Sequence, residues 1–327
     1  MKIQRIHIKN FKSIVDLEIN EPNPFTVFVG PNGSGKSNIF EALEFFSMSH
    51  KYNDTTIELF RGADSFINFN SLEKEIQIIL HLDVEYITKC NLYIDKYTIS
   101  THTGGRNYRY NDAYKSNEYE QFVKKFCRVF INNTKSEKIS LNSDSFLSTS
   151  ASNLEKVLKR ILQDDEKKQE ISEWLNLFIP GFERVEIVSS ELSSTDTLVM
   201  YEKGVQKPFT KDLLSDGTYN ILALLTAVYQ SDQPQFLCIE EPENGLNPYV
   251  VRKLVDFFRD ACENKGHYIW LNTHSGTLVD CLTPEEVILV DKVGGQTQIK
   301  QLKGLNLHGL DMAEAWLSGA LGGGTPW

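Results

Sequence analysis

The stretch Gly30-Pro31-Asn32-Gly33-Ser34-Gly35-Lys36-Ser37 decides the fold class of this chain. It matches the pattern G-x-x-x-x-G-K-[ST], in which glycines let backbone N–H groups converge on phosphates, the lysine adds a cation and the hydroxyl can bind Mg²⁺. An apolar run from Phe25 to Val29 precedes it, and apolar residues spaced by three and four follow it from Lys36, as in a strand and a helix. The alternative, a glycine turn with an accidental Lys-Ser, is disfavoured by these flanks. The expected ATP-binding residues are Asn32, Gly33, Ser34, Gly35, Lys36, Ser37 and Asn38.

A second motif is the acidic pair Glu240-Glu241, which follows the apolar run Phe236 to Ile239. Acids at the carboxyl end of a strand lie where open α/β sheets bind ligands. One carboxylate can hold Mg²⁺ or its water, and the other can polarise the water that attacks the γ-phosphate. An isolated acidic pair is more often a solvated strand end. Downstream of a phosphate-binding loop, the catalytic interpretation is favoured.

The hydrophobic pattern predicts an α/β fold with a mixed, mostly parallel central sheet, an antiparallel β-rich arm and a helical lobe. Strands are expected at 6–8, 14–19, 25–29, 76–85, 92–100, 108–110, 185–188, 197–201, 236–239, 268–271 and 287–290, with Gly104-Gly105 as a turn. Helices are expected from 36, 154, 171, 216 and 248 and after 275, with a loop over 132–152. The predicted segments are 1–66 (core with the glycine-rich loop), 67–150 (arm), 151–205 (helical lobe with return strands), 206–300 (rest of the core) and 301–327 (helix and tail).

Composition restricts the class of partner and compartment. Lys and Arg number 34 against 44 Asp and Glu, a net charge of −10, so the chain lacks the overall basic character of a dedicated nucleic-acid binder. Five cysteines without a CxxC pair indicate neither a disulfide framework nor a zinc site, which favours a reducing cytoplasm. No apolar run approaches the ~20 residues of a bilayer-spanning helix, so no membrane association is expected.

Four further segments give the chain a family resemblance. They are Ile8-Lys9-Asn10-Phe11-Lys12-Ser13, Leu214-Ser215-Asp216-Gly217-Thr218, Pro242-Glu243-Asn244-Gly245-Leu246-Asn247-Pro248 and Thr273-His274-Ser275. With the loop and the acidic pair, they resemble, in family order, the ABC-type ATPases of the SMC, RecF and overcoming-lysogenization-defect (OLD) group. The segments are similar to that family's N-terminal strand, signature motif, D-loop and switch histidine, and they extend from residue 3 to about 280.

The resemblance implies a site shared by two subunits. ATP would lie between the glycine-rich loop of one chain and the signature residues Ser215, Asp216 and Gly217 of another, so that ATP drives homodimerisation. It implies that Glu241 and His274 are catalytic and that Ser37 and Glu240 bind Mg²⁺. Simpler roles remain as alternatives: Ser215 as an ordinary helix N-cap and His274 as an ordinary strand-end histidine.

The chain also departs from the family pattern. Glu240 stands where Asp is commoner, and no residue is identified as the family's Q-loop glutamine. Long coiled-coil arms, a zinc-hook CxxC and a nuclease module after the histidine are not found. The resemblance therefore implies a head without its own nuclease, the motor or sensor subunit of a DNA-processing or antiphage defence complex with a separately encoded effector such as a nuclease or toxin.

Two alternatives belong to other functional classes. One is an ATP-gated DNA clamp like RecF; the other, a transporter subunit, is disfavoured by the β-rich insert. Nucleic-acid binding stays open because cations and aromatic residues interleave at Arg106, Tyr108, Arg109, Tyr110 and Tyr114, although a solvated hairpin is favoured there. Lys124, Lys125 and Arg128 could extend a basic stripe, or form a charged helix face. The glycine-rich tail 317–324 is expected to be a helix end with a terminus that is flexible or docks a partner.

Overall fold

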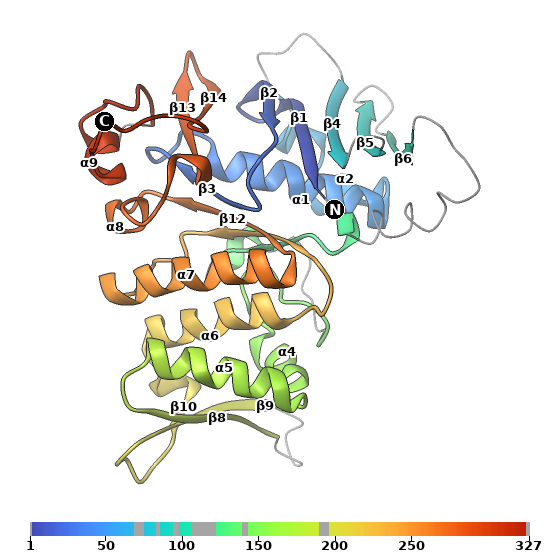
Figure 1. The fold of residues 1–327 in the computed structure, drawn as a ribbon. Coiled ribbons are helices and arrows are strands. Elements are labelled where there is room, and N and C mark those ends of the chain that lie inside the picture. Colours follow the sequence, from blue (N-terminus) through green and yellow to red (C-terminus); the bar gives the residue numbers. More distant parts are fainter. Residues whose placement is uncertain are drawn as a thin grey trace.

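The computed structural model describes residues 2–68, 75–82, 86–93, 98–105, 122–138, 143–189 and 196–324. Its strands form three sheets, and helices lie between and beside them (Figure 1). In the part of the chain described, no helix has both the length and the apolar character needed to cross a bilayer.

The central sheet has six strands in the order β14-β13-β3-β12-β11-β7. Their bounds are β3 Phe25–Val29, β7 Cys127–Val129, β11 Phe236–Glu240, β12 Tyr268–Thr273, β13 Val287–Val293 and β14 Gln296–Gln301. The pairing is parallel throughout except for β13 with β14, which is antiparallel. This confirms the predicted mixed, mostly parallel sheet.

Both faces of the central sheet are buried, which explains why its strands are continuous apolar runs rather than alternating ones. In β3, Val27 packs into the core containing helices α4 (Leu154–Ile161), α5 (Asp165–Phe178), α6 (Asp216–Tyr229) and α7 (Pro248–Lys265), whereas Phe28 packs into the core around helix α1 (Lys36–Tyr52). Leu271 and Trp270 of β12 divide in the same way. Alternate residues of each strand thus hold two helical layers on one sheet.

A second, antiparallel sheet covers the other side of α1, with the strand order β2-β1-β4-β5-β6 (Figure 1). Its strands are β1 Ile3–Phe11, β2 Ile14–Asn20, β4 Glu75–Leu82, β5 Tyr86–Tyr93 and β6 Thr98–Gly105. The predicted arm is therefore continuous with the N-terminal strands. The single strand predicted over 92–100 is wrong: β5 ends at Tyr93 and β6 begins at Thr98. The predicted turn is also wrong, because Gly104 and Gly105 pair with Ile87 and Tyr86.

The predicted helical lobe lies beyond α6 and α7 (Figure 1). It contains α4, α5 and a three-stranded antiparallel sheet of β8 (Phe182–Ser189), β9 (Asp196–Glu202) and β10 (Phe209–Thr210). α4 begins at Leu154, as predicted, and buries Leu154, Val157, Leu158 and Ile161. α5 begins at Asp165, six residues before the start expected from its apolar spacing, because Asp164 caps it by accepting from the N–H groups of Glu166 and Lys167.

Several short elements were not predicted. β7 lies inside the segment assigned to the arm, yet it pairs with β11 in the central sheet, so that segment boundary is wrong. β14 was also missed, as was the short helix α2 (Thr55–Leu59). The expected helices after 275 and near the C-terminus are α8 (Gly276–Val279) and α9 (Met312–Leu317). The tail is not loose up to residue 324: the N–H of Gly324 donates to both carboxylate oxygens of Asp291 at 2.8 Å.

Candidate active site

The glycine-rich loop, residues 30–37, joins β3 to α1 as the motif predicts. Gly33 and Gly35 have φ angles of 78° and 105°, in the left-handed region that favours glycine. A Cβ on Gly35 would lie 1.9 Å from Thr297 Oγ1, so this position also needs glycine for space. The conformation of the loop therefore depends on a close contact with β14.

Ser13 and Thr297 anchor the loop from two sides. Thr297 Oγ1 donates to the carbonyl oxygen of Ser34 at 3.0 Å, and it lies 2.6 Å from Ser13 Oγ. Asn38 Nδ2, in the first turn of α1, donates to Ser13 Oγ at 2.6 Å. The backbone N–H of Thr297 donates to Ser13 O at 2.8 Å. The turn between β1 and β2 and the strand β14 thus hold the start of α1 together.

Lys36 is buried at the start of α1, with 7% of its surface exposed. Its Nζ donates to the carbonyl oxygens of Gly30 at 2.6 Å and Pro31 at 2.9 Å. Burial lowers the pKa of Lys36, against the opposing effect of nearby carboxylates, of which Glu241 is the strongest. The two carbonyl oxygens balance the positive charge of the Lys36 ammonium group only in part. A dianionic or more highly charged ligand in the loop would supply the missing negative charge.

Ser37 and Glu240, the two residues predicted to bind Mg²⁺, are in direct contact. Ser37 Oγ donates to Glu240 Oε2 at 2.5 Å. Hydroxyl and carboxylate oxygens are the hard ligands that Mg²⁺ takes, together with phosphate and water. The donor set therefore fits a magnesium ion held between the loop and β11.

Arg128 of β7 binds the other oxygen of Glu240, with Nε donating to Oε1 at 2.6 Å. Its Nη1 donates to Glu44 Oε2 of α1 at 2.8 Å, and all three side chains are less than 10% exposed. Burial alone disfavours the charged guanidinium, but Glu240 and Glu44 outweigh it and raise the pKa of Arg128. Neither a basic stripe nor a charged helix face, the two alternatives for Lys124, Lys125 and Arg128, holds for Arg128, which lies buried in β7 and fixes the orientation of Glu240.

Glu241 occupies a strained backbone position at the end of β11, with φ 46°. Its N–H donates to both the carbonyl and the side-chain oxygen of Asn272, each at 3.1 Å. Asn244 Nδ2 donates to Glu241 Oε2 at 2.9 Å, and His274 Nδ1 lies 3.4 Å from Oε1. The structure thus brings together the two residues predicted to be catalytic, and neither carboxylate nor imidazole is buried: their side chains are 28% and 46% exposed.

A third carboxyl group, Glu243, follows the acidic pair. Thr273 Oγ1 contacts its Oε1, while Oε2 is buried without a hydrogen-bond partner among the residues described. Burial raises the pKa of Glu243, and Thr273 and His274 only partly counteract this. Glu243 was not predicted as a site residue.

The signature-like segment, residues 214–218, begins α6. Ser215 is the N-cap, accepting from the N–H of Thr218 at 3.1 Å. A Cβ on Gly217 would lie 2.4 Å from Gly245 O, so the start of α6 packs tightly against the segment that follows the acidic pair. Asn220 Nδ2 reinforces this contact by donating to Asn244 O at 2.7 Å and to Pro242 O at 3.1 Å.

A cleft of about 520 Å³ lies between the acidic pair and the start of α6, and neither the glycine-rich loop nor His274 is among the residues that line it. Asp216 lines it from α6, and Glu240, Glu241 and Asn244 line it from β11 and the following turn. Asn132, just after β7, lines the same cleft with φ 62°. Asn132 thus lies beside the acidic pair. No Q-loop glutamine was identified in the sequence, and Gln77 lies in β4, where its side chain donates to Asn91 Oδ1.

Sequence reasoning missed Arg128, Thr297, Asn272 and Asn132. Arg128 lies in β7 and Asn132 just after it, and a strand of three residues is too short for a periodic signal. Asn272 lies at the polar end of β12 and pairs in register with Glu240 of β11. A polar residue at the end of an apolar run was the one signal in the sequence that could have identified it.

The comparisons with known proteins agree with this geometry. Residues 25–280 match the family described as "AAA domain, putative AbiEii toxin, Type IV TA system". An ATP/GTP phosphatase of Helicobacter pylori is 20% identical over 350 aligned residues, covering 92% of each chain. RecF of Lactococcus lactis is 28% identical over 90 residues, and Smc of Methanocaldococcus jannaschii is 54% identical over 43. These two matches span only 25% and 4% of RecF and Smc.

Solved structures show the same fold. An Smc head bound to the C-winged helix domain of ScpA superimposes with a TM-score of 0.63 at 16% identity, covering 92% of this chain and 97% of the other. The SMC head of Thermotoga maritima gives a TM-score of 0.54 at 16% identity, with 92% and 99% covered. The family match over most of the chain, together with this fold, establishes that the protein belongs to the AAA domain, putative AbiEii toxin family and is an ATPase head of the ABC type, like those of SMC, RecF and OLD proteins.

Proposed function

We propose that this chain binds ATP with Mg²⁺ in the glycine-rich loop and hydrolyses it. The observation that carries the proposal is the meeting of two pairs at the carboxyl ends of adjacent strands: Ser37 with Glu240, and Glu241 with His274. The first pair supplies oxygen ligands for a metal, and the second a carboxylate beside a titratable ring.

Each residue has a defined role in this proposal. The loop N–H groups and Lys36 bind the phosphates, and Ser37 and Glu240 hold Mg²⁺, which when bound neutralises charge on the phosphates. Glu241 orients the attacking water and accepts its proton, while Asn244 and Asn272 hold Glu241 in place. His274 donates a hydrogen bond toward the γ-phosphate.

We further infer that ATP joins two copies of this chain. Ser215 and Asp216 are exposed at the start of α6, where a hydroxyl and N–H groups can bind an anion brought by a second subunit. Leu213, two residues before Ser215, and Tyr249, at the start of α7, are 66% and 57% exposed, and a second subunit would cover them in the proposed dimer.

The wider role that we propose is a motor or sensor subunit that works with a separately encoded nuclease or toxin. Support comes from the family description, which names a toxin, and from a relative named OLD nuclease in Thermus scotoductus, 33% identical over 86 residues. The second candidate is an ATP-gated DNA clamp, supported by the relatives named RecF and by a Rad50 ATPase of Methanococcus maripaludis. Steeply salt-dependent DNA binding by the isolated protein would favour the clamp.

The test is steady-state ATP hydrolysis by the wild type, Glu241→Gln and the control Glu263→Gln, an exposed site on α7. We expect Mg²⁺-dependent turnover that EDTA abolishes, a loss of at least about 100-fold in Glu241→Gln, and wild-type rates in the control. ATP affinity should persist in Glu241→Gln, because positioning the water matters only on the way to the transition state. His274→Ala should lower turnover while leaving ATP bound. Parental turnover in Glu241→Gln would show that these roles are wrong.

A further inference from the structure

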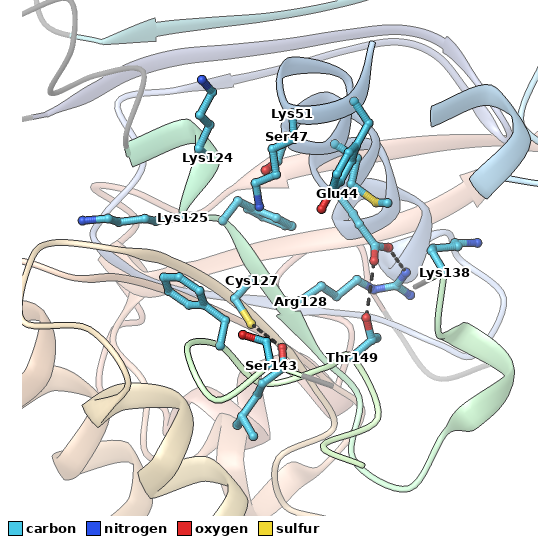
Figure 2. A pocket seen from close by; sticks show the side chains of 15 residues that line it. Glu44, Ser47, Lys51, Lys124, Lys125, Cys127, Arg128, Lys138, Ser143 and Thr149 are labelled. Carbon is cyan, nitrogen blue, oxygen red and sulfur yellow. Dashed lines mark hydrogen bonds and ion pairs between the residues drawn. The ribbon is translucent and has the colours of Figure 1, made fainter. Parts of the chain in front are cut away.

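A separate pocket of about 290 Å³ opens between the end of α1 and β7 (Figure 2). Its size is at the lower end of the range for small-molecule sites. Met48, Phe126, Phe146 and Leu147 give it mainly apolar walls. No described residue of the glycine-rich loop lines it, so it is distinct from the proposed ATP site. We call it the Lys51 pocket.

The charges around the Lys51 pocket are mostly positive. Lys51, Lys124, Lys125 and Lys138 line it, and Arg128 and Glu44 form its polar side. Arg128 is neutralised by Glu44 and Glu240, and Lys138 pairs with Glu41 at 2.8 Å. The remaining balance is cationic.

Lys51 differs from the other lysines. Figure 2 shows its ammonium group reaching into the pocket, whereas Lys124 and Lys125 point away from the centre. In the described part of the chain, Lys51 Nζ has no hydrogen bond or ion pair to another side chain. Burial lowers its pKa, and the nearby Cys127 and Glu44 do not compensate for it. Lys51 is exposed as a whole residue, so water solvates its ammonium group when the pocket is empty, and an anion in the pocket would replace this water with an ion pair beside apolar walls.

We propose that the Lys51 pocket binds a small molecule with an apolar body and one anionic group, such as an aromatic carboxylate, sulfonate or phosphate monoester. The anion pairs with Lys51, and the body packs on Phe126, Phe146 and Met48. The pocket shares two residues with the ion pairs of the proposed catalytic centre: Glu44 binds Arg128, and Arg128 binds Glu240. The proposal uses its own residues and does not require that the chain hydrolyse ATP.

The test uses 8-anilinonaphthalene-1-sulfonate, an apolar aromatic anion that fluoresces when removed from water. It is titrated into the folded protein with a non-hydrolysable ATP analogue present, so that the nucleotide site is filled. We expect saturable binding at one site per chain. Lys51→Ala should weaken it about ten-fold or more, Lys51→Arg should retain most of it, and Lys168→Ala, an exposed lysine on α5, should leave it unchanged.

A second probe, N-phenyl-1-naphthylamine, has the same aromatic body without the sulfonate. It should bind more weakly than the sulfonate to the wild type and equally to the wild type and Lys51→Ala, since it has no charge to pair. Equal affinity for both probes, no saturable binding, or undiminished sulfonate binding in Lys51→Ala would overturn the proposal. A thermal unfolding curve for Lys51→Ala that matches the wild type would show that any loss is local.

Discussion

Lys36 and Ser37 are neighbours in the sequence but have different surroundings in the loop. Lys36 is buried against carbonyl oxygens, whereas Ser37 is exposed and contacts Glu240. The difference follows from the helix start, because successive side chains at the first turn point in different directions. One motif thereby places a cation under the proposed phosphate position and a hydroxyl beside the proposed metal position.

Lys36→Ala should lower ATP affinity by about 30- to 100-fold, since it removes hydrogen bonds from a charged donor to the phosphates, each worth roughly 1.5–3 kcal/mol. Isothermal titration calorimetry with Mg-ATP would measure this. Lys253→Ala, on the exposed side of α7, is the control and should bind as the wild type does. Wild-type affinity in Lys36→Ala would show that the glycine-rich loop does not bind the nucleotide.

Arg128→Met should destabilise the fold by about 3–5 kcal/mol, because it leaves Glu44 and Glu240 buried without a counter-charge. Urea unfolding would measure the change, with Arg252→Met, an exposed residue paired to Asp280, expected to cost less than about 1 kcal/mol. The loss should be smaller at pH 5 than at pH 8, since the unpaired carboxyl groups are more easily protonated at low pH. A loss independent of pH would argue against the buried charges as its cause.

Among the secondary structure elements, the short strands β7 and β14 contribute more to the site than their lengths suggest. β7 is an edge strand of three residues that presents Arg128 to Glu240, and β14 presents Thr297 to the glycine-rich loop. Both strands close the central sheet at opposite edges. Arg128 reaches Glu240 because β7 pairs with β11, whereas Thr297 reaches the glycine-rich loop from β14, where it also contacts Ser13.

The connection between α7 and β12 predicts a pH dependence of stability. His267 is buried, and burial lowers its pKa to about 4 from an ordinary value of 6.5. The unfolded chain therefore binds a proton more readily than the folded chain, and stability should fall as the pH drops from about 6.5 to about 4. His267→Asn should remove up to about 3 kcal/mol of this fall, measured by urea unfolding at pH 7 and pH 4.5. His308→Asn, an exposed control, should leave the slope unchanged.

For the whole molecule, the exposed start of α6 at Ser215 and Asp216 predicts nucleotide-dependent assembly, whereas Gly217 is buried against Gly245. Glu241→Gln with Mg-ATP should show twice the monomer mass by light scattering, but should stay monomeric with ADP. Only ATP carries a γ-phosphate that the signature-like segment of a second subunit can bind. Adding Ser215→Arg to this variant places a bulky side chain at the exposed N-cap and should prevent the doubling without unfolding the chain. A mass that does not change with the nucleotide would locate the switch elsewhere.

The sequence by itself determined the glycine-rich loop, the acidic pair, His274 and the order of most core elements. These features are local: a loop between a strand and a helix, acids at a strand end, and apolar periods of two and 3.6 are contained in contiguous residues. The strand and turn assignments in the arm failed at 92–105, because the sequence between the paired strands β5 and β6 contains no glycine to mark where one ends and the other begins.

Only the tertiary structure decided which distant residues complete the site. Arg128 lies 112 residues from Glu240, and Thr297 lies 263 residues from Ser34, yet both make direct hydrogen bonds. No local pattern marks such residues, because their roles come from strand order and register rather than from their own neighbours in the chain. The sequence therefore specified the chemical groups of the proposed nucleotide site, whereas the sheet topology determined that Arg128 orients Glu240.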